Sequence, residues 1–290
     1  MTYNIEMYRE EDGWGGRNIS AAISTIIDAD PDVVGLQEDD DKWRSSGQYA
    51  TLTGGGYSWV KFAGNGSEYL DIFYKTDKFN KVTSGLEFYK KLAEGDYKHV
   101  DPKNADLSID TSGDEEGFLW NKQDKGRMFS YVVLEDKATG AIILIVNTHL
   151  HYGDGTGSDA EYADDNLVRD YQARLLRAWL DDMAAQYPNQ IVMGDMNATP
   201  TTSTISEYSM NNGLSFAKND ALVKGDVGGT LCNSSTYTSR DKWVFDHVAY
   251  RNMVAAEYSV INNKTDEVNG EMRYPSDHLP VIAKFICVAE

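Results

Sequence analysis

Hydrophobic positions in residues 19–38 change from the period of a helix to that of a buried strand. The apolar side chains at three- and four-residue spacing, on one helical face, are Ile19, Ala22, Ile23, Ile26 and Ile27. Pro31 then disfavours helical backbone at the residue before it, and the apolar run that follows ends in the carboxylate of Glu38. The pattern predicts a helix that leads into a buried strand over 32–38.

Further apolar runs have the length and composition of strands, at residues 69–75, 128–136, 141–150, 191–197, 244–250 and 279–288. A long helix is predicted after Asp164 and Asp165, with an apolar stripe formed by Val168, Tyr171, Leu175, Ala178 and Trp179. Short connections such as residues 135–140 favour hairpins, and hence mixed sheets in an α/β (α+β) fold. The acidic stretch 94–116 is interpreted as a surface loop.

Length and composition are those of a globular chain. With 290 residues, 41% of them hydrophobic, the chain can bury a full core, and we expect one domain over residues 1–290. An apolar run of about 18 residues and the basic-then-apolar pattern of a secretory signal are both missing from the sequence, so we expect a soluble protein, and a monomer. Cys232 and Cys287 lack CxxC spacing; two buried thiols are favoured over one disulfide.

Charge bears on the class of substrate. The formal net charge of −19, from 46 acidic and 27 basic side chains, gives no general field that attracts a polyanion. Nucleic-acid binding is therefore possible but not favoured. The isolated basic residues near polar strand ends are Lys75, Lys125, Arg127, Arg240 and Lys242, which suffice to neutralise one or two phosphates.

Polar residues that can bind a metal or move protons follow the apolar runs repeatedly. They are Asn4, Glu38, Asn147, His149, Asp195, Asn197, Asp246, Asp277 and His278. Asp195 and Asn197 lie two residues apart on an extended chain, so their side chains point the same way. Asp277 and His278 open another strand, where oxygen ligation and proton transfer can be served by neighbours.

Each signal has an ordinary structural explanation when it is taken alone. The Gly-Asp-x-Asn sequence around Asp195 is also a common turn, and a Glu after a strand is commonly solvated or a helix cap. His149 and His151 share a strand face, as a zinc pair would, but no third ligand at suitable spacing accompanies them. The joint occurrence of the segments in one order carries the functional prediction.

That ordered series resembles the endonuclease/exonuclease/phosphatase superfamily, the deoxyribonuclease I-like metal-dependent phosphoesterases, along the whole chain. The segments are Thr2-Tyr3-Asn4, Gly35-Leu36-Gln37-Glu38, Asn147-Thr148-His149-Leu150, Gly194-Asp195-Met196-Asn197 and Ser276-Asp277-His278. The resemblance implies a four-layered sandwich, in which two mixed β-sheets lie face to face with helices outside. It also implies a catalytic cleft at one end of the sheets.

The resemblance further implies a Mg²⁺ site, for which Mn²⁺ is an alternative. Glu38 is the principal ligand in this scheme, and Asn4 and Asp277 lie beside it. Asp195 and Asn197 would hold the attacking water and a nonbridging phosphate oxygen.

The two histidines complete the implied chemistry. His149 and His278 would donate to the phosphate and transfer protons, and either could be the base. Glu68 would orient His149, and Asp246 would orient His278. For substrate binding, the sequence further proposes Arg127 and Asn147.

The chain also departs from the family pattern. Relatives carry several apolar residues before the Thr-Tyr-Asn segment, whereas only Met1 precedes it here, so we expect a first strand truncated at the N-terminus. A signal peptide or an upstream domain that was removed would explain this, and a secreted or cell-envelope location would follow. His247 stands where many relatives have Tyr.

The sequence thus predicts a metal-dependent hydrolase of a phosphodiester or phosphomonoester, which acts by in-line water attack on a compact substrate. A nuclease that acts on DNA or RNA is the first alternative. A catalytically inactive binding domain on the same fold is the second. The apolar triplet at residues 118–120 could dip into a lipid surface, although its acidic flank favours a buried loop anchor.

Overall fold

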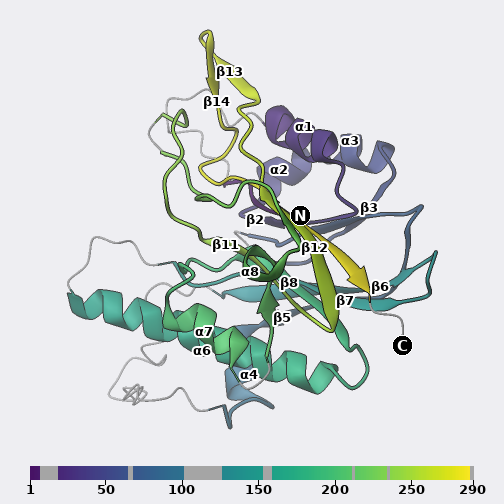
Figure 1. Cartoon of the computed structure of the whole chain (residues 1–290), viewed down its shortest axis with the longest axis vertical. Coiled ribbons are helices and arrows are strands. Elements are labelled where there is room, and N and C mark those ends of the chain that lie inside the picture. The colour runs from purple at the N-terminus through teal and green to yellow at the C-terminus, as the bar shows by residue number, and fades with distance from the viewer. Residues whose placement is uncertain are drawn as a thin grey trace.

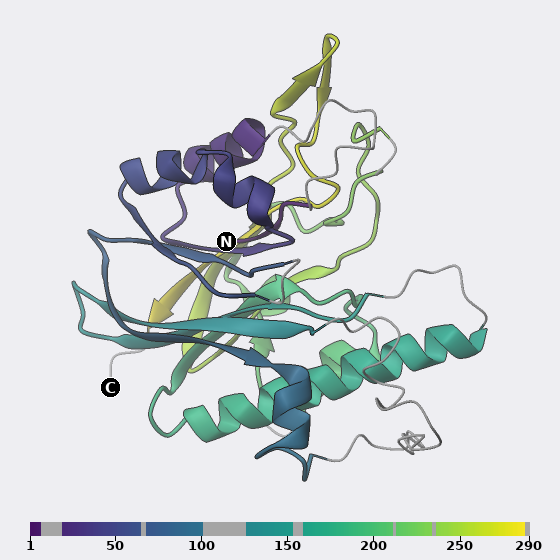
Figure 2. The ribbon, with the colours of Figure 1, turned by 180° about the vertical axis from the view of Figure 1, so that it is seen from behind.

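Two β-sheets lie face to face, and helices cover the outer face of each (Figure 1). The computed structural model describes residues 1–6, 19–64, 68–100, 126–152, 159–210, 213–233 and 236–287, without the side chains of 159–164 and 268. The view from behind shows the same layers (Figure 2). The predicted four-layered sandwich of two mixed sheets is confirmed.

The first sheet brings the N-terminal strand into its centre. Its strands are β1 (Thr2–Asn4), β2 (Val33–Gln37), β3 (Tyr57–Val60), β4 (Ile72–Lys75), β10 (Val223–Lys224), β12 (Met253–Val260) and β15 (Val281–Cys287). Their order is β10-β12-β15-β1-β2-β4-β3. Because β1 pairs in parallel with β2 and antiparallel with β15, the sheet is mixed.

The second sheet carries most of the predicted site. Its strands are β5 (Phe79–Phe88), β6 (Met128–Asp136), β7 (Ile142–His149), β8 (Asn189–Asp195), β9 (Ser215–Phe216) and β11 (Asp246–Arg251), in the order β5-β6-β7-β8-β11-β9. β7 and β8 are parallel, and β8 and β11 are antiparallel. A separate hairpin consists of β13 (Asp266–Val268) and β14 (Glu271–Arg273).

Helices form the two outer layers. α1 (Ile19–Ala29), α2 (Asp41–Ser45) and α3 (Tyr49–Gly54) lie on the first sheet, whereas α4 (Tyr89–Glu94), α6 (Asp159–Met183) and α7 (Ser203–Ser209) lie on the second. The short α8 (Ala217–Asp220) contacts β11 and β12. Among the described residues, no helix has both the length and the apolar composition that a membrane crossing requires.

Apolar side chains fill the three interfaces between the layers. Ile72 and Val132 pack between the two sheets. Ile26 of α1 packs against the first sheet, and Leu175 and Trp179 of α6 pack against the second sheet. Each fully buried side chain of this kind contributes about 1.5–3 kcal/mol of transfer free energy. The cores therefore hold the strand ends in fixed relative positions.

Most of the predicted elements are present, with some differences. The helix in 19–27 is α1, and the strand at 128–136 is β6 with the same bounds. β5 and β12 were not predicted. Of the stretch 94–116, residues 94–100 are described, and there Tyr97 packs into the core beside α4. Residues 118–120 lie outside the described part.

The cysteines are thiols and not a disulfide. Cys232 is buried, as expected, and its Sγ donates to the carbonyl of Ser276 at 3.2 Å. The expectation of a second buried thiol is wrong, because Cys287 lies near the end of β15 and is partly exposed.

Candidate active site

Strand register brings the predicted residues of the second sheet side by side. His149, at the end of β7, is paired with Asp195 at the end of β8, and Asp195 is paired with Asp246 at the start of β11. Side chains at paired positions of neighbouring strands lie on the same face of a sheet. The first sheet contributes Asn4 from β1 and Glu38 from the residue after β2. The site therefore lies at one end of both sheets.

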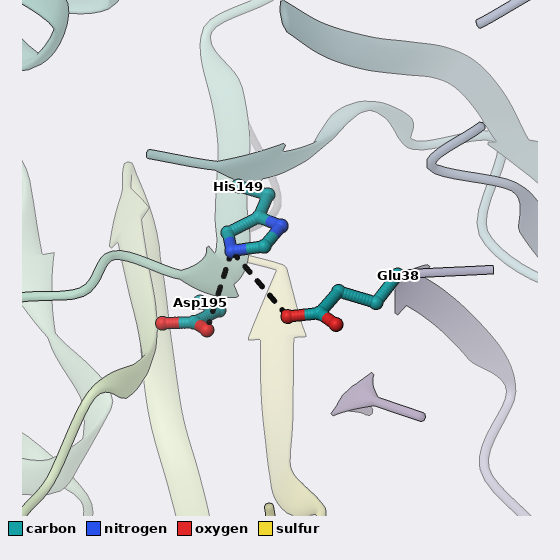
Figure 3. A group of neighbouring side chains, drawn as sticks. All are labelled: Glu38, His149 and Asp195. Atoms are coloured by element: carbon teal, nitrogen blue, oxygen red, sulfur yellow. Dashed lines mark ion pairs between the residues drawn. The ribbon is translucent and has the colours of Figure 1, made fainter. Parts of the chain in front are cut away.

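Glu38, His149 and Asp195 form a compact group of potential metal ligands (Figure 3). One ligand atom from each lies within 4.8 Å of the others. The His149 Nε2 is 3.5 Å from Asp195 Oδ2 and 4.0 Å from Glu38 Oε1. Asp195 is buried and Glu38 is partly exposed, so the group opens toward solvent on the Glu38 side. Two carboxylates of this kind are suitable ligands for a hard divalent cation.

Asn4 holds the two acids together. Its Nδ2 donates to Glu38 Oε1 and to Asp195 Oδ2, both at 3.0 Å, while its Oδ1 accepts from the backbone N–H of Glu6 at 3.0 Å. The amide nitrogen thus faces the carboxylates, and the oxygen that would ligate a metal is turned toward Glu6. Asn4 thus lies beside both acids, and its bonds in this structure are those of a bridge between carboxylates; ligation of a metal by Asn4 stays a prediction.

A carboxylate orients His149 from behind. Glu68 Oε1 lies 2.6 Å from His149 Nδ1 and also accepts the backbone N–H of Glu38 at 3.0 Å, while Oε2 accepts from Arg127 Nη1 at 3.2 Å. Burial would raise the pKa of Glu68, but His149, Arg127 and the Glu38 N–H outweigh it and lower the pKa from 4.5 to about 2. Glu68 is therefore an anion that directs the Nε2 of His149 toward the site.

His278 is oriented in the same way. Its Nδ1 lies 2.8 Å from Asp246 Oδ2, and its Nε2 lies 3.6 Å from Asp195 Oδ2. Burial would lower the pKa of His278, but the carboxylates of Asp246 and Asp195 raise it well above its usual 6.5. Asp195, Asp246 and His278 form a second compact group of ligand atoms. The two carboxylates thus favour the protonated imidazole of His278, whose Nε2 is directed at the site.

Asp195 is the point on which both imidazoles converge. Burial would raise its pKa, yet His278 and His149, together with bonds from Asn197 and Asn4, lower it. The backbone N–H of Asn197 donates to Asp195 Oδ1 at 2.8 Å, and the Asn197 amide donates to the carbonyl of Leu150 at 3.1 Å. Asn197 has a φ of +47°, and in this conformation its backbone N–H holds the carboxylate of Asp195 in place.

Two other predicted site residues, Asn147 and Asp277, have hydrogen bonds of their own in this structure. Asn147 is fully buried between the sheets, where its Nδ2 donates to the carbonyl of Leu36 at 2.8 Å and its Oδ1 accepts from Gln37 Nε2 at 2.5 Å. It bridges the sheets and does not reach the surface of the site as a substrate contact would. Asp277 is absent from both groups of ligand atoms found in the described residues, but its carboxylate helps to raise the pKa of His278. Its backbone N–H donates to Glu6 at 3.2 Å, and its role as a metal ligand stays a prediction.

The other basic residues proposed from the sequence have contacts elsewhere. Lys75 pairs with Asp30 at 2.7 Å, Arg240 pairs with Asp226 at 2.5 Å, and the Lys242 ammonium lies over the ring of Trp243. Lys125 lies outside the described residues. Of the five, Arg127 contacts the site in the described part of the chain, through Glu68.

The zinc pair considered from the sequence does not form. His151 is buried, and its Nε2 lies 2.8 Å from Oδ1 of Asp165, in the second turn of α6. Within the described residues, neither group of potential metal ligands contains His151. His151 therefore connects β7 to α6.

Some supporting residues were missed. Glu6 is buried and accepts from Tyr237 Oη at 3.1 Å as well as from Asp277. Thr230 Oγ1 accepts the backbone N–H groups of Phe245 and Asp246, at 2.9 and 3.2 Å, and so holds the start of β11. Glu6 and Tyr237 are 231 positions apart, so no local pattern could reveal their contact.

Comparison with known proteins is consistent with this geometry. The model of the endonuclease/exonuclease/phosphatase family matches residues 1–278. A solved member of that family from Bacteroides thetaiotaomicron is 20% identical, with a TM-score of 0.75 over 99% of this chain and 97% of that one. The mannosyl-6-phosphatase Bt3783 from Bacteroides thetaiotaomicron VPI-5482 is 21% identical, with a TM-score of 0.72 over 98% of each chain.

Two curated proteins are also similar in sequence. The RNA exonuclease NGL1 of Saccharomyces cerevisiae is 21% identical over 74% of this chain and 66% of its own length. The exoribonuclease subunit Ccr4 of Debaryomyces hansenii is 20% identical over 98% of this chain, which spans 38% of that protein. Because the family model extends over nearly the entire sequence, the chain belongs to the endonuclease/exonuclease/phosphatase family, whose members are hydrolases that act on phosphate esters.

Proposed function

We propose that this protein is a Mg²⁺-dependent phosphoesterase that hydrolyses a compact phosphomonoester or phosphodiester by in-line attack of water. The observation that best supports the proposal is the convergence of two carboxylate-oriented imidazoles on Asp195. The Nε2 atoms of His149 and His278 lie 3.5 and 3.6 Å from the same oxygen. Glu38 stands beside them.

The donor set fits a divalent cation. Glu38 and Asp195 offer carboxylate oxygens, and the Asn4 amide nitrogen donates to both and keeps them together. The two carboxylates would hold Mg²⁺, and the same oxygens accept Mn²⁺. When bound, the ion supplies positive charge that offsets the charge of the phosphate oxygens.

The chain's own residues account for the remaining tasks. His278, whose raised pKa keeps it protonated, donates its Nε2–H to a phosphate oxygen. Asp195, whose pKa is lowered, stays an anion that accepts a hydrogen bond from the attacking water, with Asn197 beside it. His149 transfers protons through its Nε2, and the contact of its Nδ1 with Glu68 holds the ring in the orientation that this needs. Arg127 is the additional phosphate contact, beside Glu68.

Charge supports a compact substrate. The net charge is −19, and the side chains of Lys75 and Arg240 form ion pairs away from the site. A long polyanion would therefore meet repulsion that few cations offset. The similarity to a mannosyl-6-phosphatase agrees with a sugar phosphate as the compact ester. The similarity to two proteins named as RNA exonucleases keeps RNA as the second candidate substrate.

A substrate panel tests the proposal. Nitrophenyl phosphate, bis-nitrophenyl phosphate, mannose 6-phosphate, single-stranded RNA and plasmid DNA would be compared with Mg²⁺ and with EDTA. We expect EDTA to abolish turnover, and kcat/KM to be higher on a small ester than on either nucleic acid, with weak dependence on salt. Efficient cleavage of plasmid DNA that falls steeply with salt would reject the compact substrate. No hydrolysis of any substrate would favour an inactive binding domain.

A variant tests the metal ligand separately. Glu38→Gln keeps the shape of the side chain but removes its charge, so we expect kcat at limiting Mg²⁺ to fall by about a hundredfold or more. Glu135→Gln, on the partly exposed end of β6, is the matched control. Near-native activity of Glu38→Gln at limiting Mg²⁺ would reject Glu38 as a ligand.

A further inference from the structure

Arg44 connects two parts of the chain that flank the active site. It lies in α2, six residues after Glu38, and follows Trp43, whose side chain is fully buried and whose Nε1 donates to the carbonyl of Glu6 at 3.1 Å. Asp40 caps the N-terminus of α2 by accepting the backbone N–H groups of the first turn. The cap and the buried indole therefore fix the position from which the Arg44 side chain extends.

The guanidinium of Arg44 contacts the chain on both sides of Glu68. On one side, Nη2 donates to the carbonyl of Phe62 at 2.8 Å. On the other side, Nε and Nη2 donate to the two carboxylate oxygens of Asp71 at 2.9 and 2.5 Å, and the guanidinium carbon lies 3.3 Å from the ring centroid of Tyr69. The side chain of Arg44 is 7% exposed and that of Asp71 is 0% exposed, so this contact is shielded from water.

Asp71 closes the connection by further bonds. Its carboxylate accepts the backbone N–H of Phe62 at 3.2 Å and the indole N–H of Trp59 at 2.7 Å. Tyr69, the residue next to Glu68, donates its backbone N–H to the carbonyl of Asp39 at 3.2 Å. Residue 62 and residues 69–71 are thus held to one another and to the segment that carries Glu38.

We propose that Arg44 is a positioning residue of the active site: by bracing the chain on both sides of Glu68, it fixes the Glu68 carboxylate against His149. Glu68 must stand 2.6 Å from His149 Nδ1 and also accept the Glu38 N–H, which leaves little freedom for its backbone. A lysine at position 44 retains the charge but lacks the planar group that binds Asp71 at two atoms and stacks on Tyr69. The kinetic consequence rests on the proposed phosphoesterase function, whereas the structural consequence at His149 does not.

Arg44→Lys tests this with two readouts. The first is the Nδ1 proton resonance of His149 in protein labelled with ¹⁵N-histidine, assigned by its loss in His149→Gln. The second is the separation of kcat from KM on the preferred small phosphate ester with Mg²⁺. We expect the resonance to be lost or displaced, and kcat to fall about 10- to 100-fold, because small displacements at a catalytic site have effects of this size. KM should stay within about twofold, since Arg44 does not contact the substrate.

Arg174→Lys is the matched control. Arg174 forms a similarly buried pair with Glu207, at 2.9 Å, which joins α6 to α7. This variant should lose thermal stability but keep both the His149 resonance and kcat. If a folded Arg44→Lys keeps the wild-type resonance and kcat, or if the control loses both equally, Arg44 supports stability alone and the proposal is wrong.

A second variant covers failure of Arg44→Lys to fold. Arg44→Gln combined with Asp71→Asn removes both charges of the ion pair, so that neither member of the pair is left buried without the other. Loss or displacement of the His149 resonance together with a lower kcat would support the proposal for this double variant, and wild-type values of both would reject it. If the wild-type protein hydrolyses no substrate, the proposed function fails, and the His149 resonance still decides the role of Arg44.

Discussion

Replacement of Glu68 by Gln removes a charge that the fold stabilises. The pKa of Glu68 is lowered from 4.5 to about 2 although the side chain is buried, because His149, Arg127 and the Glu38 N–H favour the ionised form. A difference of about 2.5 pKa units corresponds to about 3 kcal/mol of differential stabilisation. The Glu68 side chain is 4% exposed, so screening by solvent reduces this value little.

The sign of the pH dependence follows from the direction of this shift. Since the pKa of Glu68 is lower in the folded state, its contribution to stability is complete above pH 4.5 and is lost as the pH falls toward 2. Near pH 7, Glu68→Gln should therefore be less stable than wild type by about 3 kcal/mol. At pH 3.5 about half of that difference should be gone, because the unfolded carboxylate is then largely protonated.

Urea denaturation at several pH values between 7 and 3.5 measures the difference in unfolding free energy between wild type and Glu68→Gln, and Glu135→Gln is the control. A stability difference that is the same at every pH would refute the electrostatic reasoning, because loss of packing does not titrate. The kinetic counterpart is a decrease in kcat of about 10- to 100-fold, the usual cost of removing the carboxylate that orients a catalytic or ligating histidine. A silent Glu68→Gln would mean that His149 does not need this partner.

Three further perturbations test other parts of the structure. Gly194→Ala should lower the free energy of unfolding in urea by at least about 2 kcal/mol, because a Cβ there would lie 1.9 Å from the carbonyl oxygen of Thr148; Gly54→Ala, which meets nothing within 4 Å, is the control. Burial lowers the pKa of His247 from 6.5 to about 4, so the free energy of unfolding should fall by about 3 kcal/mol as the pH decreases from 6.5 to 4. Urea titrations of His247→Gln should lack this contribution to the pH dependence. Three β-branched residues added before Met1 should raise Tm by about 2–4 °C relative to a Gly-Ser-Gly extension, because β15 continues beyond its pairing with β1; equal Tm values would argue against an extended first strand.

The sequence predicts the fold where apolar runs are long and regular. β6 has the predicted bounds because its residues alternate between the two cores on either side of the sheet. β5 was missed because most of its residues are partly or fully exposed, so its strand conformation depends on pairing with β6. β12 was missed because a β-bulge between Ala255 and Glu257 interrupts the alternation on which sequence-based assignment depends. Tertiary pairing decides both strands.

The site is predictable to the extent that its residues end strands. In the sequence, His149, Asp195 and Asp246 stand out as polar residues at the ends of apolar strands. That they converge follows once the register of β7, β8 and β11 is known. The contribution of Arg44 depends on Asp71, 27 positions away, across a connection whose geometry local propensity does not fix. Likewise, Asn147 and His149 are two residues apart on one strand face, and the sequence does not distinguish the residue that bridges the sheets from the residue that lies in the site.

The packing of the two sheets explains why Asn147 lies beneath the site. Glu38 belongs to the first sheet and Asp195 to the second, so the distance between these carboxylates depends on how closely the sheets approach. A Cβ on Gly35 would lie 2.8 Å from the Asn147 side chain, so glycine is needed for the close contact there. The bond from Gln37 to Asn147 then joins the two sheets one residue before Glu38 and two residues before His149. Because both partners are neutral amides, this contact sets the spacing of the acids without adding a charge that would alter their pKa values.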